Sequence, residues 1–441
     1  MTTKLSTDFR TTLKKEIPAW IQEGIVSEES AQFLNTRYEL DTLKQESSRL
    51  LAAVLFTLGG LLLGGGIITF VAANWEEIPT VAKVIMLLVT LLTFHITGFW
   101  LWQQKGWSRL GHALVFAGCL VFGANIGLMA QIFHVSGEWY GLFGAWALGS
   151  VIMAYAARSW ITGVLALFTA TIWFGGFTFD HHGEWRTVFP LLVAAVFLPL
   201  AWYIHSRVLY VLTFLSITLS LAFLTAERYS SGRYVLLAIA VSGLLAWAVG
   251  EFHRTSGIKP DFGNPTAGLG LLTLALGAYV AAFHEMWRDY SFDSAVKPFS
   301  LTLLLPTVIA GVVAITLLVR SLREQNERTF LQFSVIAASV ILSICAILGA
   351  NHHGDMVLLT IAANIAALLL AGAAIASGLL DERRIAFWFG TLLTVLLILS
   401  RFLEYETSLL LKSAAFIACG AAVMAAGIAY EKYLRQKELN V

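Results

Sequence analysis

The chain is dominated by apolar segments of about 20 residues without a central charge, a length that spans the hydrocarbon core of a bilayer as a helix. A helix pairs the backbone N–H and C=O groups within each such segment, which is necessary because lipid provides no hydrogen-bond partner for them. Of the 441 residues, 58% are apolar and only 13% are charged, so a water-soluble fold could not bury these segments. The sequence excludes a soluble enzyme, a nucleic-acid-binding protein and a disordered chain, and predicts an all-α polytopic transmembrane bundle.

Fourteen segments are candidate spans, with twelve or thirteen as the alternative count because 187–204 and 384–400 are short. They are residues 51–73, 80–102, 110–133, 139–157, 160–179, 187–204, 208–226, 233–250, 266–284, 299–319, 330–350, 356–378, 384–400 and 409–430. Short connections predict antiparallel hairpins. The predicted organisation is a helical headpiece at 1–50, a bundle at 51–430 and a tail at 431–441.

Basic residues are unevenly divided between the two sides of this span map. With the N-terminus in the cytoplasm, 21 of the 29 Lys and Arg residues fall on inner segments and 8 on outer ones. Cytoplasmic loops are enriched in Lys and Arg. The asymmetry predicts that both termini are cytoplasmic, with no steering towards nucleic acid from a net charge of +1.

The polar headpiece carries helix signals. Ser27 is a predicted N-cap, because Glu28 and Glu29 follow it and suit a helix N-terminus. Pro18 is predicted to open a short helix that ends at Gly24. A small core is expected from the headpiece residues Trp20, Ile21, Ile25, Phe33 and Leu34. Two interpretations stay open: a headpiece that binds a membrane or cytoplasmic protein, or a lid on the bundle.

No acidic or basic residue lies at the centre of a span, which argues against a proton-coupled pump. The remaining polar residues in or beside the spans are His95, Asn125, Gln131, Asn364 and Asn74. They line a polar pathway in one interpretation and hydrogen-bond neighbouring helices in the other. Gly60, Gly64, Gly123 and Gly127 form small-xxx-small patterns that predict close approach of helix backbones.

Three predicted outer loops share histidine, glycine and a carboxylate before the next span: FHVSGEW at 133–139, FDHHGEW at 179–185 and NHHGDM at 351–356. Their polar side chains are His134, Glu138, Asp180, His181, His182, Glu184, His352, His353 and Asp355. Imidazole and carboxylate ligands suit transition metals. The alternative is turns whose acids cap the next helix. No catalytic residue is identified, no cofactor is expected, and an outer-face transition metal is the alternative.

Several segments resemble known families. The segment PAWIQEGIVSEESAQFL at 18–34, GGLLLGGGIITFVAANWEEIP at 59–79 and QIFHVSGEWYGLFGAWAL at 131–148 resemble the bacterial membrane-protein family called domain of unknown function 2157. The stretch RFLEYETSLLLKSAAFIACG at 401–420 is similar to the end of the related family 4401. The resemblance implies a bacterial inner-membrane location and no known activity.

Three functions are compatible with these features. Movement of a small solute or lipid would need a water-filled cavity reaching His95 or Asn125. A scaffold or sensor acting through partner proteins would show a packed core and an exposed apolar groove. A membrane metalloenzyme would bring the outer histidines and acids together. The expected partners are the lipid bilayer and a protein at residues 1–50, and no nucleic acid.

Overall fold

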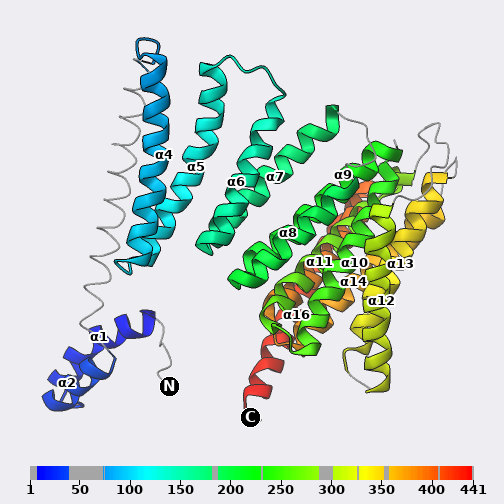
Figure 1. The fold of residues 1–441 in the computed structure, drawn as a ribbon. Helices are drawn as coiled ribbons and strands as arrows, with labels where there is room; N and C mark the ends of the chain where they lie inside the picture. Colours follow the sequence, from blue (N-terminus) through cyan, green and yellow to red (C-terminus); the bar gives the residue numbers. More distant parts are fainter. Residues whose placement is uncertain are drawn as a thin grey trace. The chain divides into compact units, whose positions relative to one another are not determined.

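Every element in the described part of the chain is helical (Figure 1). The computed structural model describes residues 7–38, 73, 75–180, 187–229, 232–287, 301–324, 327–351, 357–405 and 408–439. The chain divides into two compact units, Met1–Met86 and Leu87–Val441. The predicted boundaries of headpiece, bundle and tail stay predictions.

Two helices form the headpiece, α1 (Thr7–Gln22) and α2 (Glu28–Arg37). The predicted cap of α2 is confirmed, because the Ser30 backbone N–H donates to Ser27 Oγ over 3.2 Å. The predicted start at Pro18 is wrong, since Pro18 lies inside α1. Leu13 and Ile17 lie one turn apart upstream of Pro18 and are buried in one cluster with Ala31 of α2, and this tertiary packing stabilises the helix that precedes the proline.

The headpiece core differs in part from the expected one. Trp20, Ile21 and Leu34 pack around the buried residues Leu13, Ile17 and Ala31, as expected for the first three. Ile25 and Phe33 are wrong as core residues, being 66% and 61% exposed. Ile25 lies in the turn between the helices, and Phe33 is about 200° around α2 from buried Ala31.

Thirteen helices coincide with the last thirteen predicted spans, while the first, at 51–73, lies outside the described residues. They are α4 (Thr80–Gln103), α5 (Ser108–Ile132), α6 (Trp139–Ala157), α7 (Trp160–Asp180), α8 (Phe189–Ile204), α9 (Arg207–Tyr229), α10 (Gly232–Ser256), α11 (Pro260–Ala281), α12 (Leu301–Arg323), α13 (Thr329–Asn351), α14 (Val357–Leu380), α15 (Arg384–Glu404) and α16 (Leu409–Leu439). A short 3₁₀ helix, η2 (His284–Trp287), follows α11.

Eleven of the described helices are long and apolar enough to cross a membrane. The two exceptions among α4–α16 are α8, with 16 residues, and α11. A multi-pass, all-helical membrane protein is therefore confirmed, while the count of fourteen spans and their hairpin arrangement stay predictions.

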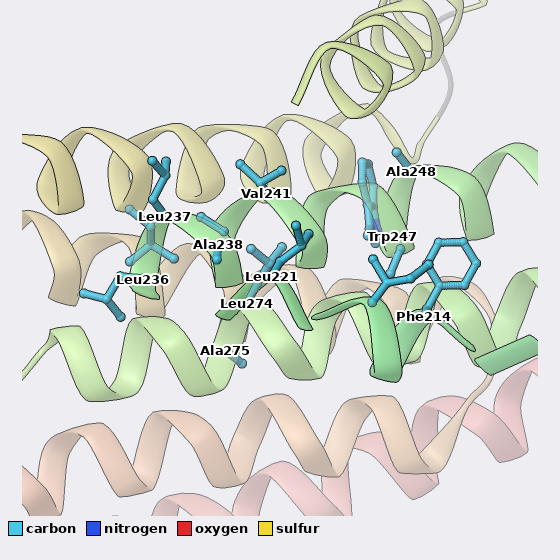
Figure 2. Packing of buried hydrophobic residues seen from close by; sticks show 14 of the residues in the cluster. Phe214, Leu221, Leu236, Leu237, Ala238, Val241, Trp247, Ala248, Leu274 and Ala275 are labelled. Carbon is cyan, nitrogen blue, oxygen red and sulfur yellow. The ribbon is translucent and has the colours of Figure 1, made fainter. Parts of the chain in front are cut away.

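Helix α10 packs at the centre of the second unit, against α9, α11, α12 and α13. Its Trp247 is 1% exposed and joins one apolar cluster with Phe214 of α9 and Leu274 of α11 (Figure 2). Helix α14 packs in turn on α11, α13 and α15. These contacts place the start of α11, the end of α14 and the start of α15 beside one another.

The backbones of α10 and α11 touch through glycines. A Cβ atom at Gly250 would lie 2.3 Å from the backbone nitrogen of Ala267, and one at Gly270 would lie 2.3 Å from that of Trp247. Both distances are far inside van der Waals contact. Only glycine permits this approach, so these residues fix how closely α11 sits on α10.

The glycine pattern on α5 works differently from the prediction. A Cβ at Gly123 would lie 2.3 Å from the indole of Trp146, not from a backbone atom. The Trp146 Nε1–H donates to the Cys119 carbonyl over 2.8 Å, which holds the ring in place. Gly123 therefore makes room for an aromatic ring of α6, and Gly60 and Gly64 lie outside the described residues.

Candidate functional site

The polar residues His95 and Asn125 are used in packing between α4 and α5. The amide Nδ2 of buried Asn125 donates to the Leu87 carbonyl over 2.9 Å. His95 Nδ1 lies 2.9 Å from the Leu91 carbonyl, so this nitrogen carries the proton. Its ring covers Gly118, where a Cβ would lie 2.6 Å away. Both side chains match the packing interpretation of these residues.

Asn364 belongs to a polar cluster that joins α11, α14 and α15. Its Nδ2 donates to the carbonyls of Ala282, over 3.0 Å, and Thr360, over 2.8 Å. Arg401 also donates to the Ala282 carbonyl and forms an ion pair with Glu404. This convergence was not apparent from the sequence, because Ala282 and Arg401 lie 119 positions apart.

The other pathway and outer-loop candidates are only partly described. Gln131 is exposed in the last turn of α5, and Asn74 lies outside the described residues. His134 is exposed with a left-handed φ of 52°. Glu138 stands at the N-cap of α6 and makes no side-chain hydrogen bond to the helix backbone, and the expected interaction of its charge with the helix dipole stays a prediction.

The remaining outer-loop residues have no described side chains: Asp180, His181, His182, Glu184, His352, His353 and Asp355. Within the described residues, no group of three or more His, Cys, Asp or Glu side chains could hold a metal ion. The outer metal site and the capped turns at these loops therefore stay predictions.

Four charged residues that sequence reasoning passed over form an ion network: Glu251, Arg254, Arg328 and Asp381. Arg254 Nη1 lies 3.0 Å from Glu251 Oε2, and Arg328 Nη1 lies 3.5 Å from Glu251 Oε1. Both guanidinium groups also pair with the Asp381 carboxylate. Two acids and two guanidinium groups thus alternate, with no described charge of the four left unpaired.

This ion network is buried at the ends of three helices. The Glu251 side chain in α10 is 0% exposed, and that of Asp381, just after α14, is 10% exposed. Gly263 of α11 leaves room for the network, since a Cβ there would lie 2.4 Å from Arg254 Cγ. Burial of charges is tolerated only with such pairing. The network therefore fixes the start of the connection from α14 to α15. In the sequence, the i, i+3 spacing of Glu251 and Arg254 was the available indication of this network.

A groove, called the lateral groove below, lies directly beside the ion network and has a volume of about 640 Å³. It runs between α11, α14 and α15 and is lined by Asn264, Gly268, Leu271, Leu272, Ala374, Glu382, Arg383, Arg384, Ile385, Ala386 and Phe389. Glu382, Arg383 and Arg384 follow Asp381 in sequence, and Glu382 has a left-handed φ of 56°. The network thus positions the charged mouth of the groove.

At the mouth of the groove, one cation and several polar groups have no partner among the described residues. The half-buried Arg383 side chain has no hydrogen-bond or ion-pair partner among the described residues. Burial, and then the positive charge of Arg254, lowers the pKa of the Arg383 guanidinium. The buried Asn264 Oδ1 likewise lacks a partner in the described part. The first N–H groups of α15 have no acceptor within the helix. This arrangement favours an anion.

One comparison with known proteins gives a match. Residues 18–163 match the model of the family described as "Predicted membrane protein (DUF2157)", which confirms the resemblance over that part of the chain. The similarity of residues 401–420 to family 4401 stays a prediction. No curated protein and no solved structure matches the chain.

Proposed function

We propose that this multi-pass membrane protein is a scaffold or sensor that takes up a bilayer amphiphile in its lateral groove. The groove volume of about 640 Å³ carries the proposal. That volume lies within the range of roughly 300–1,000 Å³ typical of small-molecule sites.

The chemistry of the groove supports an amphiphilic occupant. Leu271, Leu272 and Phe389 supply apolar walls, whereas Arg383 and Arg384 stand at the mouth. Leu272 is 41% exposed, so the groove opens on an apolar helix surface of the kind that faces lipid. An amphiphile from the bilayer matches both parts at once.

The use of the polar residues favours a scaffold or sensor over a solute pathway. Asn125 and His95 bond to backbone carbonyls of α4, and Asn364 bonds to carbonyls of its own helix and of the segment after α11. Donor groups that bond to backbone carbonyls stabilise contacts between helices and are not available to a solute. An exposed apolar groove beside a packed core is the feature expected of the scaffold or sensor class.

A protein partner at the headpiece completes the proposal. Ile25 and Phe33 are exposed apolar side chains on the headpiece, and they are the contacts proposed for this partner. The basic asymmetry supports placing this headpiece in the cytoplasm and the protein in a bacterial inner membrane. Occupancy of the groove would then be reported to a cytoplasmic or membrane partner.

Photolabelling tests the groove. Purified protein in mixed micelles is labelled with a phospholipid carrying a photoactivatable acyl chain, and the labelled peptides are identified. Gly268→Phe places a ring in the groove, where a Cβ meets nothing within 4 Å, and Gly420→Phe on exposed α16 is the matched control. Labelling of α11, α14 and α15 should fall about tenfold in Gly268→Phe alone, a loss of about 1.4 kcal/mol in binding.

Two results would overturn this function. Equal labelling of both variants and wild type would exclude the groove as the site. Proteoliposomes that exchange labelled lipid between leaflets, with the exchange blocked by Gly268→Phe, would establish lipid movement in place of a scaffold or sensor.

A further inference from the structure

We infer that the occupant of the lateral groove is an anionic phospholipid whose phosphate pairs with Arg383. The inference rests on the proposed function and names the headgroup chemistry of that same site. It starts from the ion pairs among the described residues around the mouth of the groove, which Arg254, Arg328 and Arg384 form and Arg383 does not.

Arg383 is the arginine here without a close ion pair among the described residues, and Glu382 also lines the mouth of the groove. Arg254 and Arg328 are neutralised by Glu251 and Asp381 in the ion network, and Arg384 lies 3.2 Å from Glu431. Arg383 has no comparable pair among the described residues, although it is half-buried against the groove. A guanidinium in such a place gains most from a phosphate, which it can bind through two parallel hydrogen bonds.

Neighbouring groups fit the rest of an anionic headgroup. Arg384, Ile385 and Ala386 line the groove and open α15, where backbone N–H groups favour negative charge. Asn264 also lines the groove and adds a polar side chain to its wall, which suits the hydroxyl groups of a glycerol headgroup. The quaternary ammonium of a choline headgroup has no N–H or O–H to donate, and its positive charge would stand among two arginines and the single carboxylate of Glu382.

The apolar wall of the groove favours a phospholipid over a free anion as its occupant. Gly268 and Leu272 follow Asn264 by one and two turns of α11, about 6 and 12 Å further along the helix. A phosphate held at Arg383 would therefore place its acyl chain along Leu272 and Phe389. Inorganic phosphate would leave this apolar length unused, so the groove as a whole fits a phospholipid.

Competition between defined lipids tests the headgroup. The photoactivatable phospholipid is displaced from purified full-length protein by phosphatidylglycerol or by phosphatidylcholine in mixed micelles. Phosphatidylglycerol should displace it about tenfold more effectively from wild type, because both lipids carry the phosphate but only phosphatidylcholine carries an ammonium that offsets the negative charge near Arg383. Arg383→Gln should abolish that preference, and Arg383→Lys should retain most of it.

Arg320→Gln is the matched control, because Arg320 is exposed, pairs with Glu324 over 2.8 Å and does not line the groove. It should keep the wild-type preference. The preference in unmodified protein should also weaken as salt is raised, which tests the charge contribution even if Arg383→Gln does not fold.

The outcomes separate this inference from the proposed function. Groove labelling with equal displacement by both lipids would overturn the anionic headgroup and leave the groove function standing. Labelling that Gly268→Phe does not reduce would overturn the groove function itself. Displacement by millimolar inorganic phosphate as effective as that by phosphatidylglycerol would identify a free-anion site and overturn the phospholipid.

Discussion

Replacing Gly270 with alanine should force α10 and α11 apart. The added Cβ would lie 2.3 Å from the Trp247 nitrogen, 2.7 Å from its Cα and 2.6 Å from the Gly243 carbonyl oxygen. Ordinary contact begins near 3.4 Å, so the helices must separate locally by about 1 Å. All three are backbone atoms, so no side chain can rotate away to relieve the overlap.

The expected cost follows from two opposing terms. Overpacking of this kind costs about 1–3 kcal/mol, and a gap of 0.5–1 Å loses roughly a quarter to a half of the local dispersion energy. Alanine returns up to about 1 kcal/mol because it favours a helix over glycine. Because α10 lies at the centre of the second unit, we expect a net loss of about 1–2 kcal/mol in the free energy of unfolding.

Gly268→Ala is the control on the same helix, since its Cβ meets nothing within 4 Å. It should leave stability unchanged or raise it by up to about 1 kcal/mol. The free energy of unfolding is measured by titrating mixed micelles with a denaturing detergent while following far-ultraviolet circular dichroism. A Gly270→Ala variant as stable as Gly268→Ala would refute direct backbone contact between α10 and α11.

Three further predictions concern charge, topology and metal. Asp381→Asn should lower the free energy of unfolding by about 3–5 kcal/mol, because it leaves the two guanidinium groups of the buried ion network with Glu251 as their single acid. Glu324→Gln in an exposed pair should cost less than about 1 kcal/mol in the same titration. Similar losses for the two variants would contradict the network. Reporter fusions at residue 441 and within 180–186 should report opposite sides of the membrane, and agreement between them would refute the span map. Elemental analysis of protein purified without chelator should find less than about a tenth of an equivalent of transition metal, while a full equivalent that is lost below about pH 6.5 would establish the histidine site.

The sequence by itself determined where helices α4 to α16 lie along the chain. Helices α4 to α16 each coincide with a segment recognised by length and apolarity alone. Hydropathy is a local property, and the bilayer demands the same helical solution from every segment. The Ser27 cap of α2 was equally readable, because a capping bond joins residues only three positions apart.

Tertiary structure alone decided which faces of those helices meet. On α11, Leu274 is 0% exposed while Leu276, two residues later, is 58% exposed. Both sides of this helix carry apolar residues, so no amphipathic stripe distinguishes a buried leucine from an exposed one. The sequence therefore gave no indication that Gly250 would touch Ala267, or that Asp381 would meet Arg254 from 127 positions away. The ion network and the lateral groove arise from those meetings of helix faces, because small residues and paired charges, not hydrophobicity, choose the partners inside a membrane.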